Sequence, residues 1–379
     1  MNKNKRKAVV AGLVCLDITP IFGRQKADDI REILKPGKLI NVENAQIYPG
    51  GSVSNTGLAM KKMGIDTCLI GKIGDDPFGD IVHSLYQDYD AHQDLVRVPG
   101  EATGYTMVLA VPGIDRIFLH NSGINDTFGN SDIADSRLAY ADLFHLGYPP
   151  ALKQLYQNEG EELVEVFRRA DQKGIITSLD MMPIEAGSPA SEENWLAILQ
   201  KVLPFIDYFV PSFEELCYIV DPEKYRWLIE KAGHGDITEV LSVSEDVCPL
   251  VFKAMDMGAA NVLLKCGVPG FYYCMGDQEA YKKIEARLEQ KMDTWYGAEG
   301  FEYSYKPEKV RSGAGAGDTT IAAFLTAMLQ GYSLQQSIQA ASATGTSCVE
   351  TYDVLSGVRP IPEQLKRIGD GLEKQGVFR

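Results

Sequence analysis

Several kinds of motif are absent from this sequence of 379 residues, and each absence excludes a class of protein. No apolar run approaches the roughly 20 residues that a membrane-spanning helix needs. The seven cysteines are scattered and nowhere form CxxC, and the five histidines show no HExxH or other metal-ligand spacing. The sequence therefore argues against a membrane protein, a disulfide scaffold and a zinc enzyme, and it predicts free thiols in a reducing cytoplasm.

Positive charge is also scarce. Lys and Arg together number 37 against 52 Asp and Glu, which gives a formal net charge of −15. Nucleic-acid backbones bind to clustered Lys and Arg, so general nucleic-acid binding is excluded. An anionic small molecule is not excluded, because a few oriented backbone amides can hold a phosphate on a protein of any net charge.

The N-terminal segment has a short basic run followed by the apolar stretch AVVAGLVCL, an order that also occurs in signal peptides. The stretch reaches Asp17 without a small-residue cleavage pattern, and it is rich in valine. We therefore expect a buried first strand here and a cytoplasmic location for the protein.

Short apolar runs alternate with amphipathic helical patterns along most of the chain. Strands are predicted at residues 8–16, 67–73, 143–146, 175–179, 208–210 and 261–264. Helices are predicted at 161–173, 195–202 and 213–220, and also from a cap at Asp76 to Gln87 and after a cap at Ser191. This alternation is typical of an α/β fold, in which helices cover both faces of a mostly parallel sheet and ligands bind at the carboxyl ends of strands.

Two kinds of region interrupt the alternation. Residues 36–48 and 103–120 resemble hairpins, the second with a turn at PGID, and with residues 13–22 they are expected to form a small β-lid over the strand ends. Residues 277–306 carry apolar side chains at helical spacing among charges. They predict an inserted amphipathic helix that packs on the body or on a second subunit.

The segment SGAGAGDTTIAAFLTAMLQG, residues 312–331, places a glycine-rich turn directly before an apolar helix. Such a turn directs several backbone N–H groups at one point, which makes a site for an anion. Asp318 falls in the first turn of that helix, where an acid serves either as a cap or in catalysis. The dehydrogenase fingerprint GxGxxG fails here, because its last glycine would be Asp318 or Thr320, and no GxxxxGK[ST] loop occurs.

A second glycine-containing turn begins near Tyr48, in YPGGSVSNTG. Gly50 and Gly51 permit close approach of the backbone to a ligand, and Asn55 offers a donor and an acceptor one turn into the following helix. Carboxamides and backbone amides are suited to reading sugar hydroxyls. A plain strand-to-helix turn would show the same pattern, so these residues alone leave both interpretations open.

Taken in chain order, four motifs make a more specific pattern. They are GG…N at residues 50, 51 and 55, GxxGxDxFG at 71–79, LKCGVPG at 264–270 and GAGD at 315–318. This set resembles the PfkB, or ribokinase-like, family of carbohydrate kinases. The resemblance implies one domain over residues 1–379, built as a ribokinase-like three-layer α/β sandwich with a mostly parallel central sheet and a small β-sheet lid. It also implies transfer of a phosphoryl group from ATP to a hydroxymethyl group.

The resemblance further assigns roles to individual residues. Asp318 would be the general base, and the backbone amides of Gly315, Ala316, Gly317 and Asp318 would form the anion hole. The sugar would bind to Asp17, Gly50, Gly51 and Asn55. ATP would contact Lys265, Gly267 and Gly270, with Ser212 and Ser342 at positions where the family has Asn. Hydrated Mg²⁺ would be held by Glu215, with Asp180 as a further candidate.

Two departures from the family pattern bear on specificity. Ser312 stands where the family commonly has an Asp that helps to bind a monovalent cation, so potassium dependence stays open. Gly147 stands where ribokinases carry a sugar-contacting acid, which argues against D-ribose. A nucleoside kinase remains an alternative, since Tyr48, Tyr105 and Phe118 provide stacking surface in the lid. A non-catalytic sugar or nucleotide sensor and a homodimer through the lid edge are also open.

Overall fold

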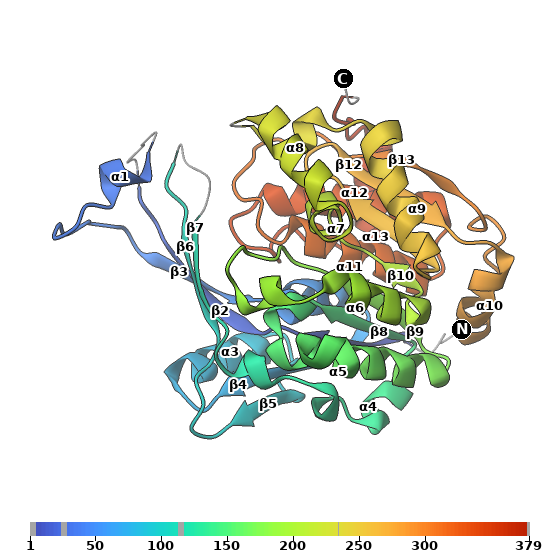
Figure 1. Ribbon diagram of the computed structural model, residues 1–379, viewed down its shortest axis with the longest axis horizontal. Coiled ribbons are helices and arrows are strands. Elements are labelled where there is room, and N and C mark those ends of the chain that lie inside the picture. The colour runs from blue at the N-terminus through green and yellow to red at the C-terminus, as the bar shows by residue number, and fades with distance from the viewer. Residues whose placement is uncertain (1–4, 24–28, 113–116, 234, 377–379) are drawn as a thin grey trace.

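The computed structural model describes residues 5–23, 29–112, 117–233 and 235–376 (Figure 1). Within these residues, nine strands form one sheet in the order β13-β12-β11-β10-β9-β8-β1-β4-β5. In this order, the seven strands from β11 to β5 are parallel to one another, and β12 and β13 are antiparallel additions at the β11 edge. Their bounds are β1 Lys7–Gly12, β4 Asp66–Gly74, β5 Leu95–Val98, β8 Leu143–Gly147, β9 Ile176–Asp180, β10 Tyr208–Phe209, β11 Asn261–Lys265, β12 Gly270–Met275 and β13 Glu299–Tyr303.

Both faces of the sheet are buried, because alternate strand residues enter two separate apolar clusters. Phe144 and Leu146 of β8 pack with α4 Asp135–Tyr140, α5 Lys153–Gln172, α6 Trp195–Val202, α7 Phe213–Val220, α8 Pro222–Ala232 and α9 Cys248–Asp256. Leu143 packs on the opposite face with α2 Ala59–Lys62, α3 Pro77–Gln87, α10 Gln278–Leu288, α11 Ala316–Leu329, α12 Leu334–Val349 and α13 Ile361–Gly369. The three layers confirm the predicted α/β class.

The small second sheet is the lid, which projects from the body beside the carboxyl ends of the main strands (Figure 1). Its order is β3-β2-β6-β7, with bounds β3 Ala45–Gly50, β2 Cys15–Pro20, β6 Tyr105–Leu109 and β7 Ile117–Asn121. Of the segment 36–48, only the end is a strand, and a short helix, α1 Ile30–Ile33, precedes it. The predicted PGID turn lies largely outside the described residues.

The first predicted strand, residues 8–16, is two strands in the structure. Gly12 ends β1 at a φ of +138°, and a Cβ there would lie 2.4 Å from the carbonyl oxygen of Gly147. After Val14, whose backbone is bound by the Asn125 side chain, the chain enters the lid as β2. The break therefore carries the chain from the body into the lid next to the strand ends.

The helix predictions were confirmed at α3, α6 and α7. The cap at Asp76 is also present, because its side chain accepts from the N–H of Gly79 at 2.7 Å. The cap predicted at Ser191 was wrong, since Ser191 lies in a 3₁₀ turn and Asn194 caps α6. No helix in the described ranges is long and apolar enough to cross a membrane.

The segment 277–306 is helical only in its first half. Asp277 caps α10, whose buried face includes Ile284 and packs with Trp295 on the cluster around α11. The second half instead forms β13, which completes the edge of the main sheet. The expectation that this segment is simply an inserted helix was therefore wrong, although the helix does pack on the body.

Candidate active site

The side chain of Asp318 lies where the N-terminus of α11 meets the carboxyl ends of the main strands. Gly315 precedes the helix at a φ of +69°, and Asp318 follows in its first turn. Its carboxyl group is buried, with only 4% of the residue exposed. Asn55 Nδ2 donates to Oδ2 at 3.0 Å. This contact joins two sequence motifs that lie 263 residues apart.

The lid contributes Asp17 to the same site. The pKa of Asp17 is raised to about 6, chiefly because the carboxyl group is buried; hydrogen bonds from Cys15 and Thr106 oppose the rise, and the nearby charge of Asp318 adds to it. Gly50 lies against this carboxyl group, because a Cβ at Gly50 would fall 2.4 Å from its carbon and both oxygens. The structure therefore places the predicted sugar ligands next to the predicted base.

Gly51 has a different local constraint. Its φ is +86°, and a Cβ there would lie 2.3 Å from the carbonyl oxygen of Leu13. The glycine lets the turn after β3 pass close to the link between β1 and β2. Its predicted contact with a sugar stays a prediction.

An ion pair joins two residues that were predicted for separate roles. Lys265 Nζ, at the end of β11, lies 2.7 Å from Asp180 Oδ1, at the end of β9. Only 1% of the Asp180 side chain and 14% of the Lys265 side chain are exposed. Burial raises the pKa of Asp180, and the ammonium group of Lys265 opposes that rise. The same lysine lies beside the first turn of α11, since a Cβ at Gly317 would be 3.6 Å from Nζ.

Ser212 and Glu215 begin α7 as a capping box. Ser212 Oγ accepts from the N–H of Glu215 at 3.2 Å, and Glu215 Oε2 accepts from the N–H of Ser212 at 2.7 Å. Ser212 also forms a β-bridge with Lys265, which places the cap beside the ion pair. One oxygen of Glu215 is therefore committed to the helix cap. The charge of Glu215 is close enough to Lys265 to help raise the pKa of that lysine.

The predicted nucleotide loop is a tight turn between β11 and β12. Gly267 and Gly270 have φ values of +64° and +132°, and the N–H of Gly270 donates to the carbonyl of Gly267 at 3.2 Å. The third predicted contact, Ser342, lies on α12 and donates its hydroxyl to the carbonyl of Tyr303 at 3.0 Å. These positions are structurally constrained, and their contact with a nucleotide stays a prediction.

Tyr148 is a site residue that the sequence reasoning missed. It follows β8 directly, and its hydroxyl donates to Asp318 Oδ1 at 2.7 Å and to Oδ2 at 2.8 Å. The neighbouring Gly147 cannot carry a side chain without a shift, because a Cβ there would lie 2.4 Å from Ser52 Cβ. The available signal was an aromatic residue at the carboxyl end of a strand, followed by two prolines.

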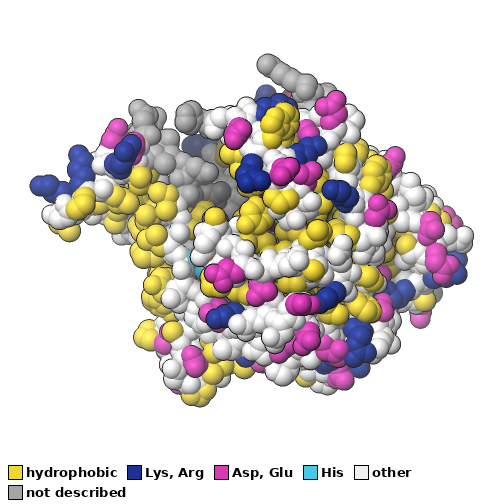
Figure 2. All heavy atoms as spheres, viewed as in Figure 1, with side chains coloured by type: hydrophobic (Ala, Val, Ile, Leu, Met, Phe, Trp, Pro, Cys, Tyr) yellow, Lys and Arg dark blue, Asp and Glu magenta, His cyan; other side chains and the backbone are white. Residues whose placement is uncertain are grey.

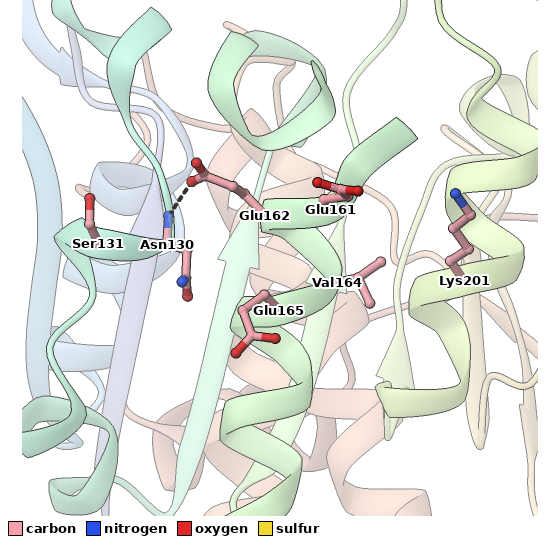
Figure 3. Close-up of a pocket in the computed structure, with 7 residues that line it drawn as sticks. All are labelled: Asn130, Ser131, Glu161, Glu162, Val164, Glu165 and Lys201. Atoms are coloured by element: carbon pink, nitrogen blue, oxygen red, sulfur yellow. Dashed lines mark hydrogen bonds between the residues drawn. The ribbon is translucent and has the colours of Figure 1, made fainter. Parts of the chain in front are cut away.

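A separate surface pocket of about 510 Å³ lies by α5 and α6 (Figure 3). It is lined by Asn130, Ser131, Glu161, Glu162, Val164, Glu165 and Lys201. The Glu162 carboxylate already accepts from the N–H of Asn130 at 2.8 Å and from Gln154 Nε2 at 2.9 Å. None of the residues predicted for catalysis or binding lines this pocket.

The fold and the site together define an α/β enzyme with a buried carboxylate at a helix N-terminus and a β-lid beside it. The family model for pfkB family carbohydrate kinases matches residues 10–360. The chain therefore belongs to the pfkB family of carbohydrate kinases, which are phosphotransferases.

Individual proteins resemble this chain over most of its length, at low sequence identity. An uncharacterized sugar kinase of Archaeoglobus fulgidus is 24% identical over 302 residues, covering 79% of this chain and 98% of its own length. The solved structure of Arabidopsis thaliana ribokinase with ribose and ATP has a TM-score of 0.66 at 20% identity, covering 96% of this chain and 98% of its own. A crystal structure from E. coli with ATP and Mg²⁺ has a TM-score of 0.67 at 18% identity, covering 96% and 99%. The chain thus has the ribokinase-like fold.

Proposed function

We propose that this carbohydrate kinase transfers the γ-phosphate of ATP to a hydroxymethyl group of a sugar, with Asp318 as general base. The observation that carries the proposal is the position of the Asp318 carboxylate in the first turn of α11, bound to Asn55 and close to Asp17. A base at this position lies between a helix end that can bind an anion and side chains that can accept hydrogen bonds from sugar hydroxyls.

In the proposed reaction, Asp318 takes the proton of the acceptor hydroxyl as its oxygen attacks the γ-phosphorus, and the bond to the β-phosphate oxygen breaks. The first N–H groups of a helix have no acceptor within the helix. Those of Gly315, Ala316, Gly317 and Asp318 therefore provide the anion hole, and each well-placed donor lowers the barrier by about 3 kcal/mol.

On the sugar side, two buried hydrogen-bond acceptors can be satisfied by hydroxyl donors of a ligand. Asn55 Oδ1 has no hydrogen-bond partner in the described part of the chain, although its Nδ2 is bound to Asp318. The carboxyl of Asp17 is the second acceptor, and Gly50 brings backbone close to it. A vicinal diol supplies two hydroxyl donors, one for each of these acceptors, so a sugar fits the site.

On the nucleotide side, Asp180 Oδ2 is buried and has no partner among the described groups. Carboxylate oxygens and water are the ligands that Mg²⁺ takes, so Asp180 and Glu215 fit a hydrated ion. Bound Mg²⁺ would neutralise charge on the phosphates. Lys265, Gly267, Gly270, Ser212 and Ser342 would contact the nucleotide. The solved E. coli structure with ATP and Mg²⁺ supports this pair of cofactors.

Two further predictions concern the binding of a monovalent cation and the cellular location of the protein. Ser312 Oγ accepts from the N–H of Ala314 at 3.2 Å, so its hydroxyl belongs to the turn and adds no carboxylate. Ser312 therefore supplies no carboxylate ligand for a monovalent cation, and potassium dependence stays open. The seven free cysteines, of which six are buried, support a cytoplasmic location.

The experiment that tests the proposal is a screen of the purified protein with Mg-ATP against pentoses, hexoses, their phosphates and nucleosides, read as ADP release. We expect a sugar to give the highest rate, with D-ribose a poor acceptor. The Asp318→Asn variant on the same panel is the control. A nucleoside as best acceptor supports the nucleoside-kinase alternative. ATP binding with no stimulated ADP release across the panel supports a sensor and contradicts the proposal.

A substitution at Gly50 tests the sugar side alone. Gly50→Ala puts a methyl group where the Asp17 carboxyl group now lies, so that carboxyl must move. We expect the KM for the sugar to rise at least tenfold and the KM for ATP to stay within about threefold. Gly369→Ala is the matched control, since a Cβ there meets no atom within 4 Å. An unchanged sugar KM would remove Asp17 from the binding site.

The lid also presents an apolar stripe on the face opposite Asp17. The register aligns Ile47, Ile18, Met107 and Leu119 across the four strands, and Ile47 and Leu119 are 41% and 53% exposed. Figure 2 shows hydrophobic side chains gathered over the lid strands. We propose a homodimer through this lid. Light scattering should give a dimer for the natural chain and a monomer for Leu119→Lys, and a monomeric natural chain would refute it.

A further inference from the structure

The backbone of Tyr148 has a conformation that is uncommon for a side chain of its size. Its φ and ψ are +66° and +45°, in the left-handed region that favours glycine and asparagine. The turn is held by the N–H of Tyr148 donating to the carbonyl of Asp180 at 3.3 Å, and Pro149 and Pro150 follow it, both buried. A tyrosine kept in such a turn indicates that the side chain has a function.

The hydroxyl of Tyr148 binds both oxygens of the proposed base, and the two oxygens are not equivalent. Oδ2 accepts from Tyr148 at 2.8 Å and from Asn55 Nδ2 at 3.0 Å, which occupies both of its in-plane lone pairs. Oδ1 accepts from Tyr148 alone, at 2.7 Å. Among the described groups, the carboxylate is thus left with one unused acceptor site, on Oδ1.

We propose that Tyr148 is a positioning residue that, together with Asn55, fixes the Asp318 carboxylate so that Oδ1 receives the proton of the sugar hydroxyl. The inference rests on the proposed role of Asp318 as base. The arrangement of β8 supports it, since Gly147 leaves no room for a side chain beside Ser52. The side chain that the turn after β8 supplies to the site is therefore the phenol of Tyr148.

The hydrogen bonds also affect the charge of the base. Burial raises the pKa of Asp318, and the charge of Lys265 opposes that rise. The donors on Tyr148 and Asn55 act in the same direction as Lys265, because they stabilise the ionised carboxylate. The titratable groups that face Asp318 are Asp17 on β2, Tyr148 after β8, Asp180 on β9, Lys265 on β11 and Cys348 on α12.

The test is Tyr148→Phe, which removes the hydroxyl and keeps the ring. A hydrogen bond to an ionised group is equivalent to about one pKa unit, so the pKa of Asp318 should rise by about one unit. The single-turnover rate, with the best acceptor of the panel, should therefore fall about tenfold more on the acid side than at high pH, where the loss that remains measures the lost positioning. A ¹³C-NMR titration of the Asp318 carboxyl carbon, assigned with Asp318→Asn, should show the same shift without any acceptor.

Tyr156→Phe is the matched control, because Tyr156 is a buried tyrosine on α5 that packs against Trp195 away from the site. Tyr148→Asn is a second variant, since asparagine is tolerated at positive φ, and it should show the same shift. An unchanged Asp318 titration, or a single-turnover rate that is unchanged at every pH, would overturn the role of Tyr148. If Asp318→Asn remained active, the proposed base itself would be wrong, and the two failures are thereby distinguished.

Discussion

Replacing Asp318 with asparagine is expected to lower kcat by at least 10²-fold while the Kd for Mg-ATP changes by less than about twofold. The carboxamide has nearly the same shape as the carboxylate and can still accept hydrogen bonds from Asn55 and Tyr148. It cannot take a proton from the sugar hydroxyl, and a general base contributes roughly 10²- to 10⁴-fold to a rate. Rapid-quench kinetics and calorimetry of Mg-ATP binding measure the two quantities separately.

A control for the charge change alone is Asp277→Asn. Asp277 caps α10 just after the end of β12, which pairs with the start of β11 and so lies at the sheet edge opposite the site. Asparagine caps a helix about as well as aspartate. That variant should keep a normal kcat. A near-normal kcat in Asp318→Asn would remove Asp318 as base and leave Asp17, the other carboxylate on the sugar side, to be tested in the same way.

The sequence was sufficient to bring the main site residues together, because its four motifs in order resemble the pfkB family, which assigns them to one site. Asp318, Asn55 and Asp17 come from motifs far apart in the chain, and all three meet in the structure. The contact between Lys265 and Asp180 could not be predicted, since it depends on β9 and β11 lying on either side of β10. Strand order is not encoded in any local pattern.

Tyr148 shows a second limit of sequence reasoning. Its function depends on a left-handed turn at the end of β8, and no local signal predicts that conformation for a tyrosine. The sequence drew attention to Gly147 as a missing acid. In the structure Gly147 supplies no side chain to the site, and the next residue, Tyr148, contacts the proposed base Asp318 instead.

Two of the wrong predictions, for residues 8–16 and 277–306, have a shared cause, which is strand pairing between segments that are distant in the chain. The run 8–16 is uniformly apolar, yet β1 pairs with β4 and β8 in the body while β2 pairs with β3 and β6 in the lid. The segment 277–306 has helical spacing from Ile284 to Trp295, but Glu299–Tyr303 near its end pairs with β12 as β13. Periodicity describes a local preference, and the partner strand decides the outcome.

Lys265→Met is expected to have the second large effect, on stability as well as activity. The substitution leaves the Asp180 carboxylate buried without its 2.7 Å partner. Removing one member of a buried ion pair costs about 3–5 kcal/mol, so the free energy of unfolding and the Tm should fall clearly. Loss of a positive charge beside the first turn of α11 should also lower kcat by about 10²-fold.

The double variant Lys265→Met/Asp180→Asn separates these two effects. Because it removes both charges, it should recover most of the lost stability, since replacing a buried pair by neutral groups is often nearly neutral. Activity should not recover, because the positive charge and the proposed Mg²⁺ ligand are both gone. Thermal unfolding and single-turnover kinetics on Lys265→Met, Asp180→Asn and the double variant complete the cycle. Recovery of activity together with stability would show that Lys265 acts only by neutralising Asp180, and it would remove this lysine from the phosphate site.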